Sequence, residues 1–241
     1  MIEAGSLEYA HARLSARFGN RPDEAAWGRI ETLRELGAML DAARASPLAA
    51  WLARIGPDAD AHAVERAMRT HLRERVAAIA AWMPAPWRAS IEWCGVLADL
   101  PLLQHLARGG AAPAWLVDGD PPRRKAIDAF LATGELDPER PGATWRDGWM
   151  RRLPDGHRRS APLAEFVRLI DGHIEAWRDT GQVDTRAARR RLHARLMSMY
   201  RRATLDPAVA FIFLALSALE FERLRGEILR RVVFAQLPLA A

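Results

Sequence analysis

Histidine is the residue type in this chain that could hold a metal ion, because its ring nitrogens bind zinc and other transition metals. The chain has seven histidines and one cysteine. His62 and His71 are nine positions apart, which does not place them on neighbouring helical turns, and no His-Glu-x-x-His pattern occurs. The remaining histidines are scattered along the chain: His11, His105, His157, His173 and His193. We therefore expect no metal site and no bound cofactor.

The residue types that catalyse group transfer are present without the spacing that such chemistry needs. The Asp-Gly-Asp segment at 118–120 resembles the start of a calcium loop, but the later acidic ligands are missing. The single lysine, Lys125, lies outside any glycine-rich phosphate loop. Cys94 has no histidine close to it in sequence, and no Gly-x-Ser-x-Gly motif occurs. We expect no catalytic residue, and an enzyme whose site forms only in the folded chain stays an open alternative.

Arginine supplies nearly all of the positive charge. The net charge is +5, and the excess lies in the second half, where residues 121–241 hold 22 basic and 15 acidic side chains. No acidic residue lies between Arg186 and Arg202, so this segment could bind phosphate or carboxylate groups. Leu192, Leu196 and Met199 recur within it at helical spacing, which predicts an amphipathic helix with a basic outer face. Our candidates there for binding nucleic acid or an acidic protein partner are Arg189, Arg190 and Arg191.

Helices must position these residues, because alanine, leucine and arginine favour helix and no convincing alternating strand pattern occurs. Asp60 is placed to cap a long helix over 61–83. The most apolar segment, 208–219, has 12 residues, whereas a bilayer-spanning helix needs roughly 20, so we expect it to be buried in protein. The expected helices are 7–18, 22–36, 39–44, 47–55, 61–83, 87–97, 101–109, 126–132, 162–180, 185–202 and 207–234.

The middle of the chain is rich in proline, a residue that interrupts helices, with six prolines between positions 111 and 160. We therefore divide the chain into an N-terminal helical unit (1–110), a connecting region (111–160) and a C-terminal helical unit (161–241), with one continuous domain as the alternative. The expected fold class is all-α, a multi-helix cup or bundle built from helical hairpins. Three residues of the last helix are expected in its core: Phe213, Leu216 and Leu224.

Three segments together resemble one protein family. Residues 9–13 read Tyr-Ala-His-Ala-Arg, residues 99–108 read Asp-Leu-Pro-Leu-Leu-Gln-His-Leu-Ala-Arg, and residues 220–228 read Glu-Phe-Glu-Arg-Leu-Arg-Gly-Glu-Ile, with a Leu-Pro at 237–238. The combination is similar to the family of rotor-socket proteins of V/A-type ATPases, the C-type subunits of bacteria and archaea and the d-type subunits of eukaryotes. Members of that family have a Tyr-x-x-Ala-Arg start, Asp-x-x-Asn-Leu-x-x-Leu-x-Arg helices and a final Glu-x-x-x-Leu-Arg element. Leu102 stands where the family has asparagine, and the chain is shorter than typical members.

The resemblance implies a non-catalytic helical socket that links the central stalk of a rotary ATPase to its proteolipid ring, and so serves ion transport without a cofactor. The implied partners are central-stalk and membrane-ring subunits. The implied place is cytoplasmic, at the inner face of the membrane, without a membrane span. The positions that carry over as partner-binding or structural residues are Tyr9, Arg13, Asp99, Leu103, Arg108, Glu222, Leu224 and Arg225.

Simple helix geometry suggests what several of these residues do. Tyr9 and Arg13 are four positions apart, so they share one helix face and are expected to pack the first helix on its neighbour. Asp99 is expected to cap the helix that follows it. Glu222 and Arg225 are three positions apart and are expected to form an ion pair on the last helix. The alternative is that they fix one helical unit against the next, or face the stalk.

Overall fold

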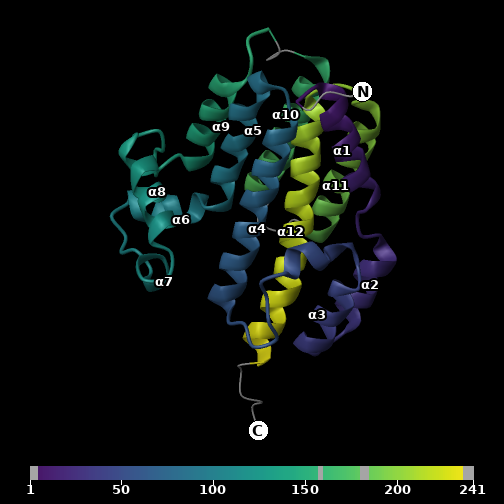
Figure 1. Cartoon of the computed structure of the whole chain (residues 1–241), viewed down its shortest axis with the longest axis vertical. Coiled ribbons are helices and arrows are strands. Elements are labelled where there is room, and N and C mark those ends of the chain that lie inside the picture. The colour runs from purple at the N-terminus through teal and green to yellow at the C-terminus, as the bar shows by residue number, and fades with distance from the viewer. Residues whose placement is uncertain (1–4, 157–159, 180–184, 236–241) are drawn as a thin grey trace.

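The computed structural model describes residues 5–156, 160–179 and 185–235, and within these ranges the chain is helical, without β-strands (Figure 1). The all-α prediction is confirmed. The α-helices are α1 (Leu7–Gly19), α2 (Glu24–Thr32), α3 (Leu36–Arg44), α4 (Ala61–Trp82), α5 (Ala85–Trp93), α6 (Leu100–Ala107), α7 (Ala114–Val117), α8 (Pro121–Ala132), α9 (Pro141–Arg152), α10 (Ala161–Asp179), α11 (Thr185–Arg202) and α12 (Ala208–Ala235). Two 3₁₀ helices, η1 (Pro47–Leu52) and η2 (Cys94–Ala98), precede α4 and α6.

Side-chain caps explain where several of these helices begin. The predicted cap of α4 is confirmed, because the backbone N–H of Ala63 donates to Oδ1 of Asp60 at 2.6 Å. Asp23 caps α2 in the same way, and Ser6 caps α1. Each cap satisfies a backbone donor that has no partner inside its own helix, which fixes the helix start locally.

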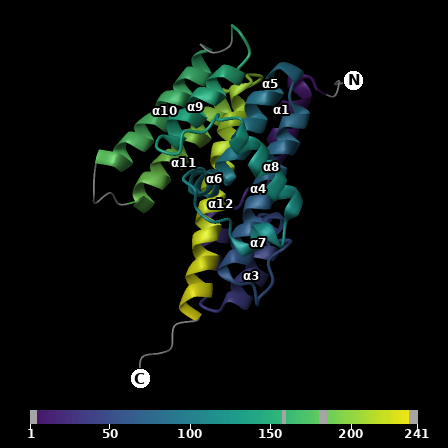
Figure 2. The same cartoon turned by 90° about the vertical axis from the view of Figure 1, so that its left-hand side faces the viewer.

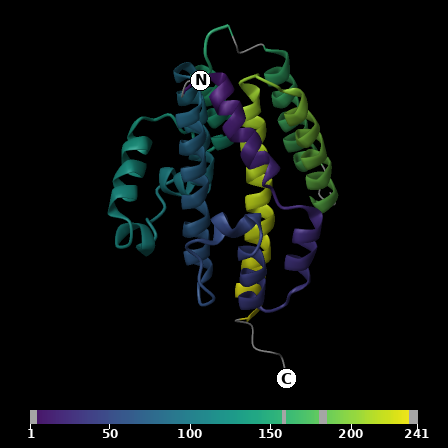
Figure 3. The same cartoon turned by 45° about the vertical axis from the view of Figure 1, so that its right-hand side comes forward.

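Helices α4 and α12 run antiparallel through the centre of the molecule and contact each other along their length (Figure 3). Helix α12 has 28 residues and extends along the long axis of the molecule (Figure 2). Helices α10 and α11 lie on one side of this central pair, and α6 to α8 project from the other side (Figure 3). Helices α1, α3, α5, η1 and η2 contact α4 or α12, whereas α2 packs on α3 and α9 packs on α5.

Two hydrophobic cores lie one after the other along α12. The first contains its N-terminal half with residues of α1, α4, α5, α9, α10 and α11, among them Phe213 and Leu216, which are 2 % and 0 % exposed. The second contains its C-terminal half, including Leu224 (0 % exposed), with residues of α2, α3, η1 and the start of α4. All three residues predicted for the core are therefore buried. Both cores combine residues from the first and last of the predicted units.

The proline-containing stretch 111–160 carries more structure than the sequence suggested. It holds α7, α8 and α9, of which only the end of α8 was expected. Pro121 and Pro141 are the first residues of α8 and α9. At this position the backbone N–H has no partner within the helix, so proline loses no hydrogen bond, and its fixed φ favours the helical conformation. A small third core joins α6, α7 and α8: Leu102, Leu103, Leu116, Ile127 and Leu136.

Helix α9 is held against α5 by two tryptophans. The indole N–H of Trp93 donates to the carbonyl of Trp145 at 2.8 Å, and the indole N–H of Trp145 donates to the carbonyl of Trp93 at 3.2 Å. Gly148 permits this approach, because a Cβ atom there would lie 2.5 Å from the ring of Trp93. The last turns of α9 then place Trp149 and Leu153 in the first core.

The apolar segment 208–219 is packed inside the protein, as expected, with seven consecutive residues from Ala208 to Leu214 buried. None of the described helices combines the length and the apolar character that crossing a bilayer requires.

Candidate interaction site

A layer of buried polar residues separates the two cores. Glu220 of α12 is 7 % exposed, and its two oxygens face two arginines. The Nε atom of Arg21 lies 2.5 Å from Oε1, and Nη1 of Arg75 lies 3.7 Å from Oε2. Arg75 also donates to Ser217 Oγ at 3.2 Å. A buried carboxylate is costly unless it is paired, so this layer fixes how α12 lies against α1 and α4.

Beyond Glu220, the charged residues of α12 bind helices from the start of the chain. Arg223 Nε donates to Glu31 of α2 at 2.7 Å, and Arg225 Nε donates to Glu65 of α4 at 2.5 Å. The hydrogen bond to Glu65 raises the pKa of Arg225. The expected pair of Glu222 with Arg225 is present at 3.9 Å, a long distance for an ion pair on a half-exposed surface. Arg225 is therefore held by Glu65 more than by its neighbour on α12.

Arg231 completes this set of contacts near the end of α12. Its side chain is 4 % exposed. Its Nη2 donates to the carbonyl of Ile30 at 3.0 Å, and its Nε donates to the carbonyl of Leu33 at 2.9 Å. These carbonyls lie at the C-terminal end of α2, where helix carbonyls lack partners and favour a cation. The Glu-x-x-Arg-x-Arg segment and Arg231 therefore attach α12 to α2, α4 and the segment that follows α1.

Asp99 is a second buried carboxylate and, like Glu220, it is held by two arginines. Its side chain is 3 % exposed, it accepts from Arg73 Nη1 at 2.9 Å, and it pairs with Nη2 of Arg123. Arg73 belongs to α4 and Arg123 to α8, so Asp99 joins the projecting α6–α8 segment to the central pair. The expected capping role is wrong, because Asp99 occupies the N-cap position of α6 but its side chain makes no cap hydrogen bond. Hydrogen bonds from two charged guanidinium groups stabilise a buried carboxylate more than one hydrogen bond from a neutral backbone N–H does.

Tyr9 and Arg13 pack α1 on α4, as their spacing predicted. The guanidinium of Arg13 lies 5.7 Å from the ring centre of Tyr9 and 5.0 Å from that of Trp82.

Leu103 is buried in the third core at 3 % exposure. Arg108 is exposed and pairs with Glu139 at 3.1 Å. The resemblance residues are thus spread over several parts of the fold, and the Leu-Pro at 237–238 lies outside the described residues.

The basic helix α11 has the predicted amphipathic form. Leu192, Leu196 and Met199 are buried in the first core, and Arg189, Arg190 and Arg191 are exposed. At its two ends, arginines pair with Glu31 of α2 at 3.0 Å and with Glu165 of α10 at 2.9 Å. Within the described part of the chain, no carboxylate pairs with four exposed arginines of this helix: Arg190, Arg191, Arg195 and Arg201.

The described residues contain no group of three or more metal-ligating side chains. Cys94 is not suited to nucleophilic attack, because burial raises the pKa of its thiol to about 12. The pKa of His71 is lowered to about 4, mainly by burial and in part by the nearby charge of Arg75. His71 also lies 4.7 Å from the ring of Trp51, centre to centre. These histidine and cysteine side chains are packed among other residues and do not converge on a shared ligand position.

The arginines that hold the two buried carboxylates were not singled out from the sequence. These partners are Arg21, Arg73, Arg75 and Arg123. The available signal was indirect: Glu220 directly follows a long apolar segment, and a carboxylate in such a place requires a cation. The sequence does not indicate which of 34 arginines supplies it, because Arg21 and Glu220 are 199 positions apart.

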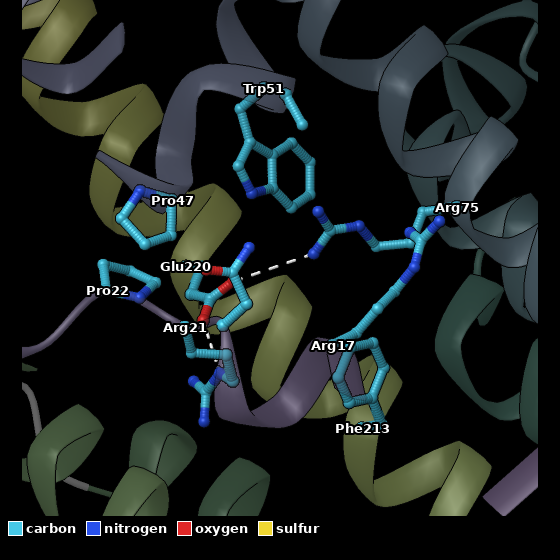
Figure 4. A pocket seen from close by; sticks show the side chains of 10 residues that line it. Arg17, Arg21, Pro22, Pro47, Trp51, Arg75, Phe213 and Glu220 are labelled. Carbon is cyan, nitrogen blue, oxygen red and sulfur yellow. Dashed lines mark hydrogen bonds and ion pairs between the residues drawn. The ribbon is translucent and has the colours of Figure 1, made fainter. Parts of the chain in front are cut away.

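A cavity of about 190 Å³ opens beside Glu220, between the end of α1, η1, α4 and α12. Figure 4 shows Glu220 between Arg21 and Arg75, with Trp51 beside the guanidinium of Arg75. That guanidinium lies 4.3 Å from the centre of the Trp51 ring. The cavity is lined by Arg17, Asn20, Arg21, Pro22, Pro47, Ala50, Trp51, Arg75, Phe213 and Glu220.

The fold and these contacts define an all-α protein with two stacked cores joined by buried ion pairs. Comparison with models of known protein families, with curated proteins and with solved structures finds no match to this chain.

Proposed function

We propose that the protein is a non-catalytic helical component of a rotary-ATPase-like assembly, where it links a central stalk to a membrane ring at the cytoplasmic face. One observation carries the proposal. The segments that resemble the rotor-socket family of V/A-type ATPases hold together helices that are far apart in the sequence. Arg13 holds α1 on α4, Asp99 holds α6 to α4 and α8, and Arg225 holds α12 on α4. Residues used in this way suit a part that transmits force.

Stiffness is the physical property that such a connector needs, because torque must pass through it without deforming it. Close-packed cores resist compression. Here two cores share one 28-residue helix, α12, and the layer around Glu220 fixes the register of that helix against α4. A buried ion pair of this kind restricts the ways in which two helices can pack.

A second candidate is an adaptor that binds nucleic acid or an acidic protein through α11. The observation that favours it is the set of exposed arginines on this helix that no described carboxylate neutralises. Unpaired arginines bind phosphate and carboxylate groups well. Both candidates are interaction functions, and they differ in the partner.

Affinity purification of the tagged full chain from gently solubilised native cells distinguishes them, with one half of the lysate treated with nuclease. Quantitative mass spectrometry of both halves then identifies the partners. Recovery of rotary-ATPase stalk and ring proteins, unchanged by nuclease, is the expected result. Partners that disappear with nuclease would favour the nucleic-acid adaptor. Enrichment of an unrelated complex, or of the chain alone, would overturn the rotary-ATPase proposal.

A further inference from the structure

The side chains that line the cavity beside Glu220 carry more positive than negative charge. Three arginines and one glutamate line it, which leaves an excess of two positive charges. Arg21 and Arg75 both face Glu220. Within the described residues Arg17 pairs with no carboxylate, and its guanidinium instead lies 4.7 Å from the ring centre of Trp82. A structure that only needed to neutralise Glu220 would not require the third arginine.

The arginines of this cavity also repel one another. The pKa of Arg75 is lowered to about 10, mainly by burial, and the charges of Arg17 and Arg21 contribute to this lowering against the opposing effect of Glu220. The Nε atom of Arg75 is buried and has no hydrogen-bond acceptor. An anion between these side chains would relieve the repulsion and accept hydrogen bonds that are now unmade.

We propose that this cavity binds a phosphate group, held by Arg17 and Arg75 beside the pair of Arg21 with Glu220. Arg21 is already engaged, because its Nη1 contacts Met197 Sδ at 2.7 Å and its Nη2 lies 3.2 Å from His193 Nε2. The charge fits, because a phosphate group carries about −1.5 to −2 at neutral pH, close to the excess of two positive charges. The size fits as well, since the volume of about 190 Å³ far exceeds the roughly 10–15 Å³ that one water needs. Guanidinium groups approaching from α1 and α4 suit the several oxygens of a phosphate. Asn20, at the end of α1, adds an amide donor to the lining.

The phosphate can come from two sources that share this chemistry: free inorganic phosphate, or the phosphate of a small monoester. Trp51, Pro22 and Pro47 give the cavity an apolar wall that could hold the carbon part of a monoester. Glu220 borders the site and also begins the resemblance segment 220–228, but the arginines that would hold the phosphate lie outside the three resemblance segments. The phosphate titration involves no rotary-ATPase subunit, so it tests the site separately from the proposed function.

Calorimetric titration of the full chain with inorganic phosphate tests the site, with sodium chloride of equal ionic strength as the reference solution. We expect saturable binding and a melting temperature that rises with phosphate beyond the chloride reference. Arg17→Gln removes one guanidinium at an exposed position and should weaken phosphate binding about tenfold or more, the loss typical of a hydrogen bond to a charged group. Circular dichroism confirms that each variant is folded.

Arg13→Gln is the matched control, because Arg13 lies one turn earlier on α1 and packs on the same Trp82 ring but does not line the cavity. It should bind phosphate as the wild type does. A parallel titration with glycerol phosphate identifies the source: binding of both ligands points to a monoester site, and binding of inorganic phosphate alone points to a free anion. The absence of saturable phosphate binding, or an equal loss in Arg13→Gln and Arg17→Gln, would overturn the proposal.

Discussion

Arg21 Nε lies 2.5 Å from Glu220 Oε1, although the two residues are 199 positions apart in the chain. This pair closes the fold, because it joins the segment after α1 to the middle of α12 at the level where the two cores meet. The side chains are 10 % and 7 % exposed. At that depth neither charge is well hydrated, so each depends on the other and on Arg75.

Glu220→Ala is expected to destabilise the protein by about 3–5 kcal/mol, because it leaves Arg21 and Arg75 buried without a counter-charge. Urea unfolding followed by circular dichroism measures the change. The control is Glu222→Ala, two positions away on α12, where the side chain is 44 % exposed and the ion-pair distance is 3.9 Å. It should cost less than about 1 kcal/mol. Similar losses in the two variants would show that the buried layer contributes no more than a surface pair.

Phe213→Ala is expected to cost about 3–5 kcal/mol, because the ring is 2 % exposed and its removal leaves a hole in the first core. Its partner across the core is Tyr200, whose ring lies 6.3 Å away, centre to centre. Val233→Ala on the same helix is the control, since Val233 is 48 % exposed. A melting temperature that Phe213→Ala leaves unchanged would contradict the burial of this face of α12.

Acid should destabilise the protein partly through His71. Burial lowers the pKa of His71 to about 4 in the folded state, from an ordinary value of 6.5. Between about pH 6.5 and 4 the unfolded chain therefore binds a proton that the folded chain does not, and the free energy of unfolding falls as the pH falls. His71→Phe keeps a ring beside Trp51 and removes the titration. Urea unfolding at pH 7 and pH 5 should show a smaller acid-induced loss in the variant, and identical pH profiles would contradict the assignment.

Reversal of three charges on α11, with Arg189, Arg190 and Arg191 changed to Glu, tests whether this surface binds an acidic partner. The three side chains are exposed, so the melting temperature should change little. Recovery of a partner that uses this surface should fall sharply, and the wild-type interaction should weaken with salt.

The matched control for this experiment reverses three exposed arginines elsewhere on the surface: Arg29, Arg34 and Arg140. It changes the net charge by the same amount and leaves α11 intact. If both triple variants reduce partner recovery equally, the loss is due to overall charge. If the α11 variant does not reduce partner recovery, the basic face of α11 is a solvent-exposed surface that binds no partner.

The sequence by itself determined the helices whose ends and faces are encoded locally. The limits of α11 were predicted as 185–202, the cap of α4 at Asp60 was correct, and the burial of Phe213, Leu216 and Leu224 followed from the apolar pattern. Periodicity and caps depend on neighbours within a few positions, so a single sequence contains them. Proline was the source of error at α8 and α9, because the same residue can end one helix or begin the next.

Only the tertiary structure decided how the buried charges are used. The sequence placed Asp99 at a helix start, where a capping role was predicted, and Glu220 after an apolar segment, where no partner was predicted. Packing brings Arg73 and Arg123 to Asp99, and Arg21 and Arg75 to Glu220. The cavity that borders Glu220 follows from the same packing. A buried carboxylate requires a cation, and the helix that supplies it is selected by how distant segments pack together.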